Sequence, residues 1–99
     1  MTLLVEWSPR SKLEYFYLLN YLKENLGKEK VDESMISIAK IILRIADMPL
    51  MFPPISKSKT KIRYAVLTKH TTIIYKISRK KIEIASLFDT RQNPTKRKI

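Results

Sequence analysis

The sequence predicts an α+β domain in which an antiparallel helical hairpin packs on one face of a mainly antiparallel sheet. Two apolar stripes with helical spacing follow one another across residues 8–48, with a single glycine between them. Three segments rich in β-branched and aromatic residues then fill residues 61–88, and only "KH" and "RKK" separate them. Connections this short permit an antiparallel three-strand meander and exclude a parallel crossover.

A strand and a helix are expected at the N-terminal end. The segment "TLLVEW" alternates its side chains in the manner of a short strand. The helix that follows has Ser8 as N-cap, Pro9 at its first helical position and Gly27 at its end. Its apolar stripe consists of Tyr15, Leu18, Leu19, Leu22 and Leu26.

A second helix is predicted over Lys28 to Met48. Its apolar positions alternate steps of four and three: Val31, Met35, Ile38, Ile42 and Ile45. The prolines of "PLMFPPIS" end this helix, and we expect the segment to be a stiff, non-helical connection.

The three strands are predicted at Lys61–Thr68, Thr71–Ser78 and Ile82–Phe88, and alternation sorts their side chains into two faces. The face against the helices should hold Ile62, Tyr64, Val66, Ile73, Tyr75, Ile77, Ile82, Ile84 and Phe88. The open face should hold Arg63, Ala65, Leu67, Thr72, Ile74, Lys76, Glu83, Ala85 and Leu87. An apolar, basic-edged face of this kind indicates a binding groove, unless the tail, the proline loop or a second copy covers it.

Charge is distributed unevenly along the chain. Residues 1–48 carry seven Lys/Arg and seven Asp/Glu, whereas residues 57–99 carry thirteen Lys/Arg against two Asp/Glu, the whole net charge of +11. This asymmetry indicates an anionic partner such as nucleic acid, an acidic protein or an anionic membrane. We expect one domain over residues 1–94 and a basic tail over residues 95–99.

Several classes of function are disfavoured by composition. The absence of cysteine argues against disulfides and thiolate metal sites and fits a cytoplasmic protein. One histidine and scattered carboxylates offer no metal-ligand spacing, and a single glycine excludes a glycine-rich phosphate loop. No signal peptide, membrane-spanning run or basic amphipathic helix is recognisable. We therefore expect neither a metal, a cofactor nor a membrane partner.

The last predicted strand ends at a polar cluster. Asp89, Arg91 and Gln92 follow Phe88 directly, and we expect them at the surface, at the end of the open face. They would complete a patch with the basic and titratable residues Arg63, His70 and Lys76. Three less specific alternatives remain open: Asp89 caps a turn, His70 occupies a turn, and the tail merely adds solubility.

The chain also resembles a known family. In order and spacing, "WSPRSKLEYFYLLNYL", "MPLMFPP", "IRYAVLTKHTTIIYKI" and "IEIASLFDTRQNP" are similar to the RelE/ParE toxins of type II toxin–antitoxin modules. The resemblance implies a growth-inhibiting toxin of a plasmid-stabilisation type of system. It also implies a cognate antitoxin that neutralises the toxin in a hetero-oligomer.

The family contains two activities, DNA gyrase inhibition in ParE-like members and ribosome-dependent mRNA cleavage in RelE-like members. The late His or Tyr of the nucleases is missing here, because nothing after Tyr75 is either residue, so the ParE-like activity is favoured. Target-binding candidates are Arg63, Lys76, Asp89, Arg91 and Gln92. If the chain is an endoribonuclease, the catalytic candidates are His70, Asp89 and Arg91. A non-toxic basic module that binds nucleic acid is the further alternative.

Overall fold

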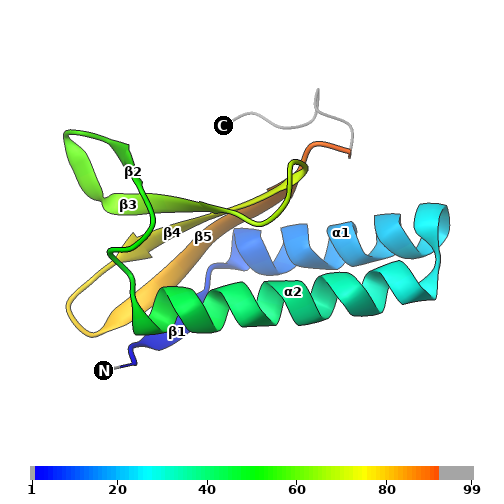
Figure 1. The fold of residues 1–99 in the computed structure, drawn as a ribbon, viewed down its shortest axis with the longest axis horizontal. Coiled ribbons are helices and arrows are strands. Elements are labelled where there is room, and N and C mark those ends of the chain that lie inside the picture. Colours follow the sequence, from blue (N-terminus) through cyan, green and yellow to red (C-terminus); the bar gives the residue numbers. More distant parts are fainter. Residues whose placement is uncertain (1, 92–99) are drawn as a thin grey trace.

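The computed structural model describes residues 2–91 and has two layers, a helical hairpin and a sheet (Figure 1). The helices are α1 (Pro9–Leu26) and α2 (Lys28–Asp47). The strands are β1 (Leu4–Trp7), β2 (Pro54–Ser56), β3 (Lys59–Val66), β4 (Thr71–Ile77) and β5 (Lys81–Asp89). They form one sheet in the order β1-β5-β4-β3-β2, in which β1 runs parallel to β5 and the other pairs are antiparallel. The predicted fold class is confirmed.

The boundary signals of α1 act as expected. The Ser8 hydroxyl oxygen accepts a hydrogen bond from the Ser11 backbone N–H at 3.0 Å, and Pro9 is the first helical residue. Gly27 has a φ of 90°, a conformation that suits glycine and turns the chain directly into α2. The Ser8 hydroxyl also donates to the Ala85 carbonyl at 3.0 Å, which fixes the start of α1 beside β5.

The core lies between the hairpin and the sheet. Its fully buried members come from both helices and the three central strands: Leu18, Leu22, Ile38, Ile45, Ala65, Ile73, Tyr75, Ile82, Ile84 and Leu87. The predicted helical stripes are correct at their centres. They are wrong at Leu26 and Met35, which are 50% and 44% exposed.

The predicted faces of β3 are wrong by one residue. Ala65 pairs with buried Ile73, and Arg63, two residues earlier, pairs with buried Tyr75. Residues 63 and 65 of β3 therefore face the helices. Ile62, Tyr64 and Val66 therefore lie on the open face. Both phases of this strand contain apolar residues, so alternation alone does not choose between them.

A bulge reverses the predicted faces of the last strand near its end. Tyr75 pairs with Ile84 and Ile74 with Ser86, which leaves Ala85 as an extra residue between them. Leu87 consequently lies in the core, and Phe88, paired with Thr72, lies on the open face.

The proline-rich connection is more regular than predicted. Within it, Pro54–Ser56 forms the edge strand β2 beside β3, with an irregular register between its two paired ends. Prolines are tolerated at such an edge because one side of the strand needs no donor.

Candidate functional site

A polar cluster lies where the β3–β4 turn meets the end of β5. The register brings it together, because Thr71 at the start of β4 pairs with Asp89 at the end of β5. The Thr90 N–H donates to the His70 carbonyl at 2.8 Å, and the Thr90 hydroxyl lies 3.3 Å from Nδ1 of His70. The structure therefore unites the predicted His70, Asp89 and Arg91 in one strand-end cluster.

Asp89 is fully buried, so the expectation that it lies at the surface is wrong. Its Oδ1 accepts from the N–H and Nε of Arg91 at 2.8 and 2.9 Å. Its Oδ2 accepts from the Thr71 hydroxyl at 2.8 Å and from Nη2 of Arg91 at 2.6 Å. A carboxylate has about four lone-pair positions, and these four bonds fill them. The carboxylate organises its own strand end, which agrees with the turn-capping alternative.

The surroundings of Asp89 also fix its charge. Burial by itself would raise the pKa of the Asp89 carboxyl, but hydrogen bonds from Arg91 and Thr71 outweigh burial and lower that pKa below its ordinary value. The side-chain hydrogen bond between Arg91 and Asp89 also raises the pKa of the Arg91 guanidinium. The pair is therefore a permanent ion pair at neutral pH.

This ion pair predicts an acid-sensitive contribution to stability. Because the pKa of Asp89 is lower in the folded chain than in the unfolded one, its contribution is complete above the unfolded pKa of about 3.9 and disappears as pH falls through the folded pKa. We expect the stability difference between the natural chain and Asp89→Asn to shrink below about pH 4. Urea unfolding at a series of pH values measures it, and a difference independent of pH would contradict the assignment.

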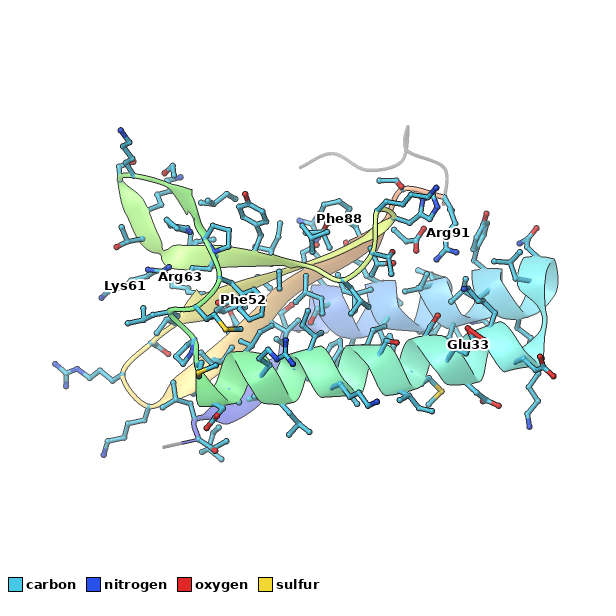
Figure 2. The ribbon with its side chains drawn as sticks, in the orientation of Figure 1. Glu33, Phe52, Lys61, Arg63, Phe88 and Arg91 are labelled. Carbon is cyan, nitrogen blue, oxygen red and sulfur yellow. The ribbon has the colours of Figure 1, made fainter. Side chains whose placement is uncertain are left out.

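Arg63 does not join the cluster and does not face the open side. Its Nη1 donates to the Phe52 carbonyl at 2.7 Å, and it is paired with Tyr75 on the helix-facing side (Figure 2). The hydroxyl of Tyr75 donates to the Pro49 carbonyl at 2.6 Å, and burial raises the pKa of this hydroxyl to about 12. The two side chains hold the connection after α2, so Arg63 is a tether of that connection.

Lys76 lies on the open face, as predicted, but is remote from the cluster. It is five residues along β4 from Thr71, roughly 17 Å at the usual rise per residue. Its direct neighbours across the sheet are Ile62 and Glu83. Gln92 lies outside the described residues. The single predicted patch is therefore divided between the strand-end cluster and the open face.

The open face is apolar, and no element of residues 2–91 covers it (Figure 1). The register places these residues on it: Ile62, Tyr64, Val66, Thr72, Ile74, Lys76, Glu83 and Phe88. Val66 is 57% exposed, and Tyr64, Ile74 and Phe88 are half-buried. An exposed apolar face exists, as predicted, but most of its apolar residues are ones that were predicted to face the helices.

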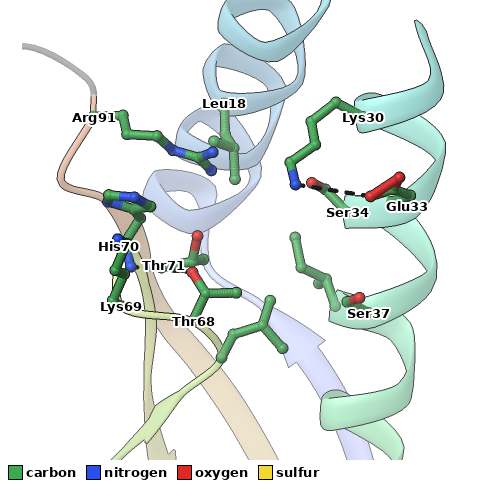
Figure 3. A pocket seen from close by; sticks show the side chains of 12 residues that line it. Leu18, Lys30, Glu33, Ser34, Ser37, Thr68, Lys69, His70, Thr71 and Arg91 are labelled. Carbon is green, nitrogen blue, oxygen red and sulfur yellow. Dashed lines mark hydrogen bonds and ion pairs between the residues drawn. The ribbon is translucent and has the colours of Figure 1, made fainter. Parts of the chain in front are cut away.

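A cleft of about 210 Å³ lies next to the strand-end cluster, on the side of the sheet that faces the helices and not on the open face (Figure 3). The start of α2, the β3–β4 turn and Arg91 line it. The sequence does not predict this cleft, because its residues are distant in the chain and the pattern of α2 indicates only an apolar stripe.

Neither a metal centre nor a membrane span is indicated within residues 2–91. These residues contain no group of three or more His, Asp or Glu side chains close enough to hold a metal ion. Neither helix in this part of the chain is long and apolar enough to cross a bilayer.

Comparisons with known proteins identify the fold. No family model matches the chain, and no curated protein matches it. Among solved structures, the chromosomal ParDE toxin–antitoxin system from P. aeruginosa aligns with a TM-score of 0.73 and 11% identity, over 89% of this chain and 96% of that one. A YoeB/ParE toxin from Agrobacterium tumefaciens has a TM-score of 0.64 and 12% identity, over 87% and 96%.

The E. coli DinJ–YafQ toxin–antitoxin complex gives a similar result, with a TM-score of 0.61 and 13% identity, over 92% of this chain and 96% of that chain. The chain therefore has the fold of the ParE, YoeB and YafQ toxins. This confirms the resemblance to the RelE/ParE group at the level of fold. ParE and the other toxin types both occur among the neighbours, so the fold does not separate the two activities.

Proposed function

We propose that this chain is the toxin of a type II toxin–antitoxin module and that it inhibits growth by binding a protein target, DNA gyrase. The observation that carries the proposal is the apolar face of the sheet that no element of residues 2–91 covers. Apolar side chains gathered on one exposed face are typical of a protein-binding surface. The similar folds of the ParDE system and the YoeB/ParE toxin support the toxin assignment.

The chemistry of the strand end favours binding over catalysis. A ribonuclease that uses 2′-hydroxyl attack needs a group with a free lone pair to accept the proton. Asp89 does not meet this need, because Arg91 and Thr71 fill its acceptor positions and its lowered pKa makes it a weak base.

Ribosome-dependent mRNA cleavage is the second candidate, and the position of His70 favours it. The imidazole lies at the same strand end as Arg91, where an acid or base and a cation would both be available to a phosphodiester. If this candidate is correct, His70→Ala and Arg91→Ala should each lose on the order of 10²-fold in cleavage rate.

Inducible expression in a bacterial host tests the proposal. Growth should stop on induction, and the purified chain should inhibit DNA supercoiling by gyrase while leaving mRNA on translating ribosomes intact. Cleaved mRNA with unimpaired supercoiling would select the ribonuclease alternative. Normal growth with tight binding to nucleic acid would select the non-toxic nucleic-acid-binding module.

The partner that neutralises the toxin is proposed to be an acidic antitoxin segment. The outer side of α1 offers it an apolar stripe of Leu13, Phe16 and Tyr17, which are 52%, 59% and 54% exposed. They are spaced as one helical face, and the rings of Phe16 and Tyr17 lie 5.8 Å apart. The chain as a whole carries a net charge of +11, located in residues 57–99, and this charge opposes association with a second copy and favours an acidic partner.

Phe16→Glu should weaken the antitoxin complex about tenfold or more, because it removes an aromatic anchor and adds a charge that repels an acidic segment. Toxicity and thermal stability should not change, since the side chain is largely exposed. Isothermal titration with the antitoxin measures the effect, and Phe16→Leu is the matched apolar control. Equal affinities for the two variants would exclude this stripe as the docking surface.

A further inference from the structure

We infer that the cleft between α2 and the β3–β4 turn is a binding site for a phosphate group, either free or as a monoester. This site is separate from the open face, and the inference does not depend on the proposed function. It rests on the convergence of cationic and hydroxyl side chains from three parts of the chain on one small cavity (Figure 3).

The cations come from opposite walls of the cleft. Lys30 projects from α2, Lys69 belongs to the turn, and the Arg91 side chain enters from beyond the end of β5 (Figure 3). His70 lies beside Arg91 on the turn side. These four side chains line a space of about 210 Å³, so an anion inside it would be contacted from several directions.

Arg91 is held in place for this role. Its Nε and Nη2 are both engaged by the buried Asp89 carboxylate, which fixes the plane of the guanidinium. An arginine carries five N–H donors, so three remain beyond those two bonds. The preformed ion pair thus positions a cation without using all of its donors.

Hydroxyl groups supply neutral donors between the cations. Ser34 and Ser37 lie one turn apart on the α2 wall, and Thr68 lies on the turn. The Thr68 oxygen accepts from the N–H groups of His70 and Thr71 at 3.0 and 3.2 Å. Because its acceptor positions are occupied in this way, its O–H remains available to donate to an anion.

The volume of the cleft and its apolar lining indicate which ligand it can hold. A cleft of about 210 Å³ is smaller than the roughly 300 Å³ at which sites for drug-sized molecules begin, so it suits a single functional group. Its floor is apolar, formed by Leu18, Ile38 and Leu67, and apolar surroundings strengthen charged hydrogen bonds. A tetrahedral phosphate can accept bonds from three walls at once, whereas a planar carboxylate presents acceptors in one plane.

Glu33 also lines the cleft, and its negative charge opposes the binding of an anion, so a substitution of Glu33 tests the proposed site. Its carboxylate lies 3.7 Å from Nζ of Lys30, and the two side chains are 66% and 43% exposed. An exposed pair at this distance is weak, so a phosphate can replace Glu33 as the partner of Lys30. Removing the Glu33 charge should therefore improve phosphate binding.

The experiment is an NMR titration of the ¹⁵N-labelled full chain with inorganic phosphate at constant ionic strength. Saturable shifts should be confined to the amides of residues 30–37 and 68–71 and of Arg91. Lys30→Gln should weaken binding and Glu33→Gln should tighten it, each by roughly two- to fivefold. Lys57→Gln is the matched control, because it removes one positive charge from the exposed β2–β3 turn, and it should not change the affinity.

A parallel titration with adenosine 5′-monophosphate distinguishes the two sources. Tighter binding than inorganic phosphate identifies an ester as the ligand, and weaker binding identifies the free anion. Acetate binding as tightly as phosphate would overturn the assignment to a tetrahedral anion. Shifts spread over the basic surface, with equal losses in Lys30→Gln and Lys57→Gln, would overturn the site itself.

Discussion

Asp89→Ala should lower the free energy of unfolding by about 3–5 kcal/mol, the range for removing one member of a buried ion pair. The substitution leaves the Arg91 guanidinium, only 21% exposed, without its counter-charge. It also leaves the buried Thr71 hydroxyl without its acceptor. The end of β5 should also become disordered in the variant, because the Arg91 N–H loses its hydrogen-bond acceptor.

Urea unfolding of the variant measures this effect, and the chain contains a matched control. Glu6 and Lys81 form an ion pair at 2.7 Å, almost as short as the 2.6 Å between Arg91 and Asp89, but their side chains are 60% and 47% exposed. Glu6→Ala should therefore leave the unfolding midpoint nearly unchanged. Equal losses in the two variants would show that distance, and not burial, determines the contribution of these pairs.

The helices could be predicted from the sequence because their signals are local. Ser8, Pro9 and Gly27 act through their own backbone and side chains, and the structure confirms each of them. The strands were located for the same reason, since short connections leave little freedom in the meander. The small edge strand Pro54–Ser56 was missed, because proline normally argues against a strand.

Strand faces could not be predicted, because they depend on pairing between distant segments. In β3, small Ala65 lies in the core while Tyr64 and Val66 face outward, the reverse of what side-chain size indicates. In β5, the bulge at Ala85 exchanges the faces of Leu87 and Phe88. This bulge lies beyond the end of β1, where the Leu87 N–H donates instead to the Glu14 carboxylate on α1 at 3.0 Å.

The candidate site was predicted in part. That His70, Asp89 and Arg91 lie together follows from a meander with a two-residue turn. The burial of Asp89 did not follow, because it depends on the same bulge that turns Leu87 inward. The position of Arg63 could not follow either, because its partners are backbone carbonyls of the connection after α2.

Val66→Glu should abolish target inhibition while leaving the fold intact. Val66 is 57% exposed on the open face, so the substitution should change stability by no more than about 1 kcal/mol. On binding, however, a carboxylate would be buried among apolar side chains without a partner. We expect at least a 30-fold loss of affinity for the target, which corresponds to about 2 kcal/mol, and a corresponding loss of toxicity.

The control for this prediction is Val66→Thr, which keeps the β-branched shape and exchanges one methyl group for a hydroxyl. It should retain most of the inhibition of DNA supercoiling and of growth. Thermal melting of both variants separates loss of function from loss of structure, and the antitoxin complex should form normally with each, because its proposed docking stripe lies on α1. A folded Val66→Glu protein that still inhibits growth as strongly as the natural chain would place target recognition away from the open face, and the strand-end cluster around Arg91 would then be the surface to test.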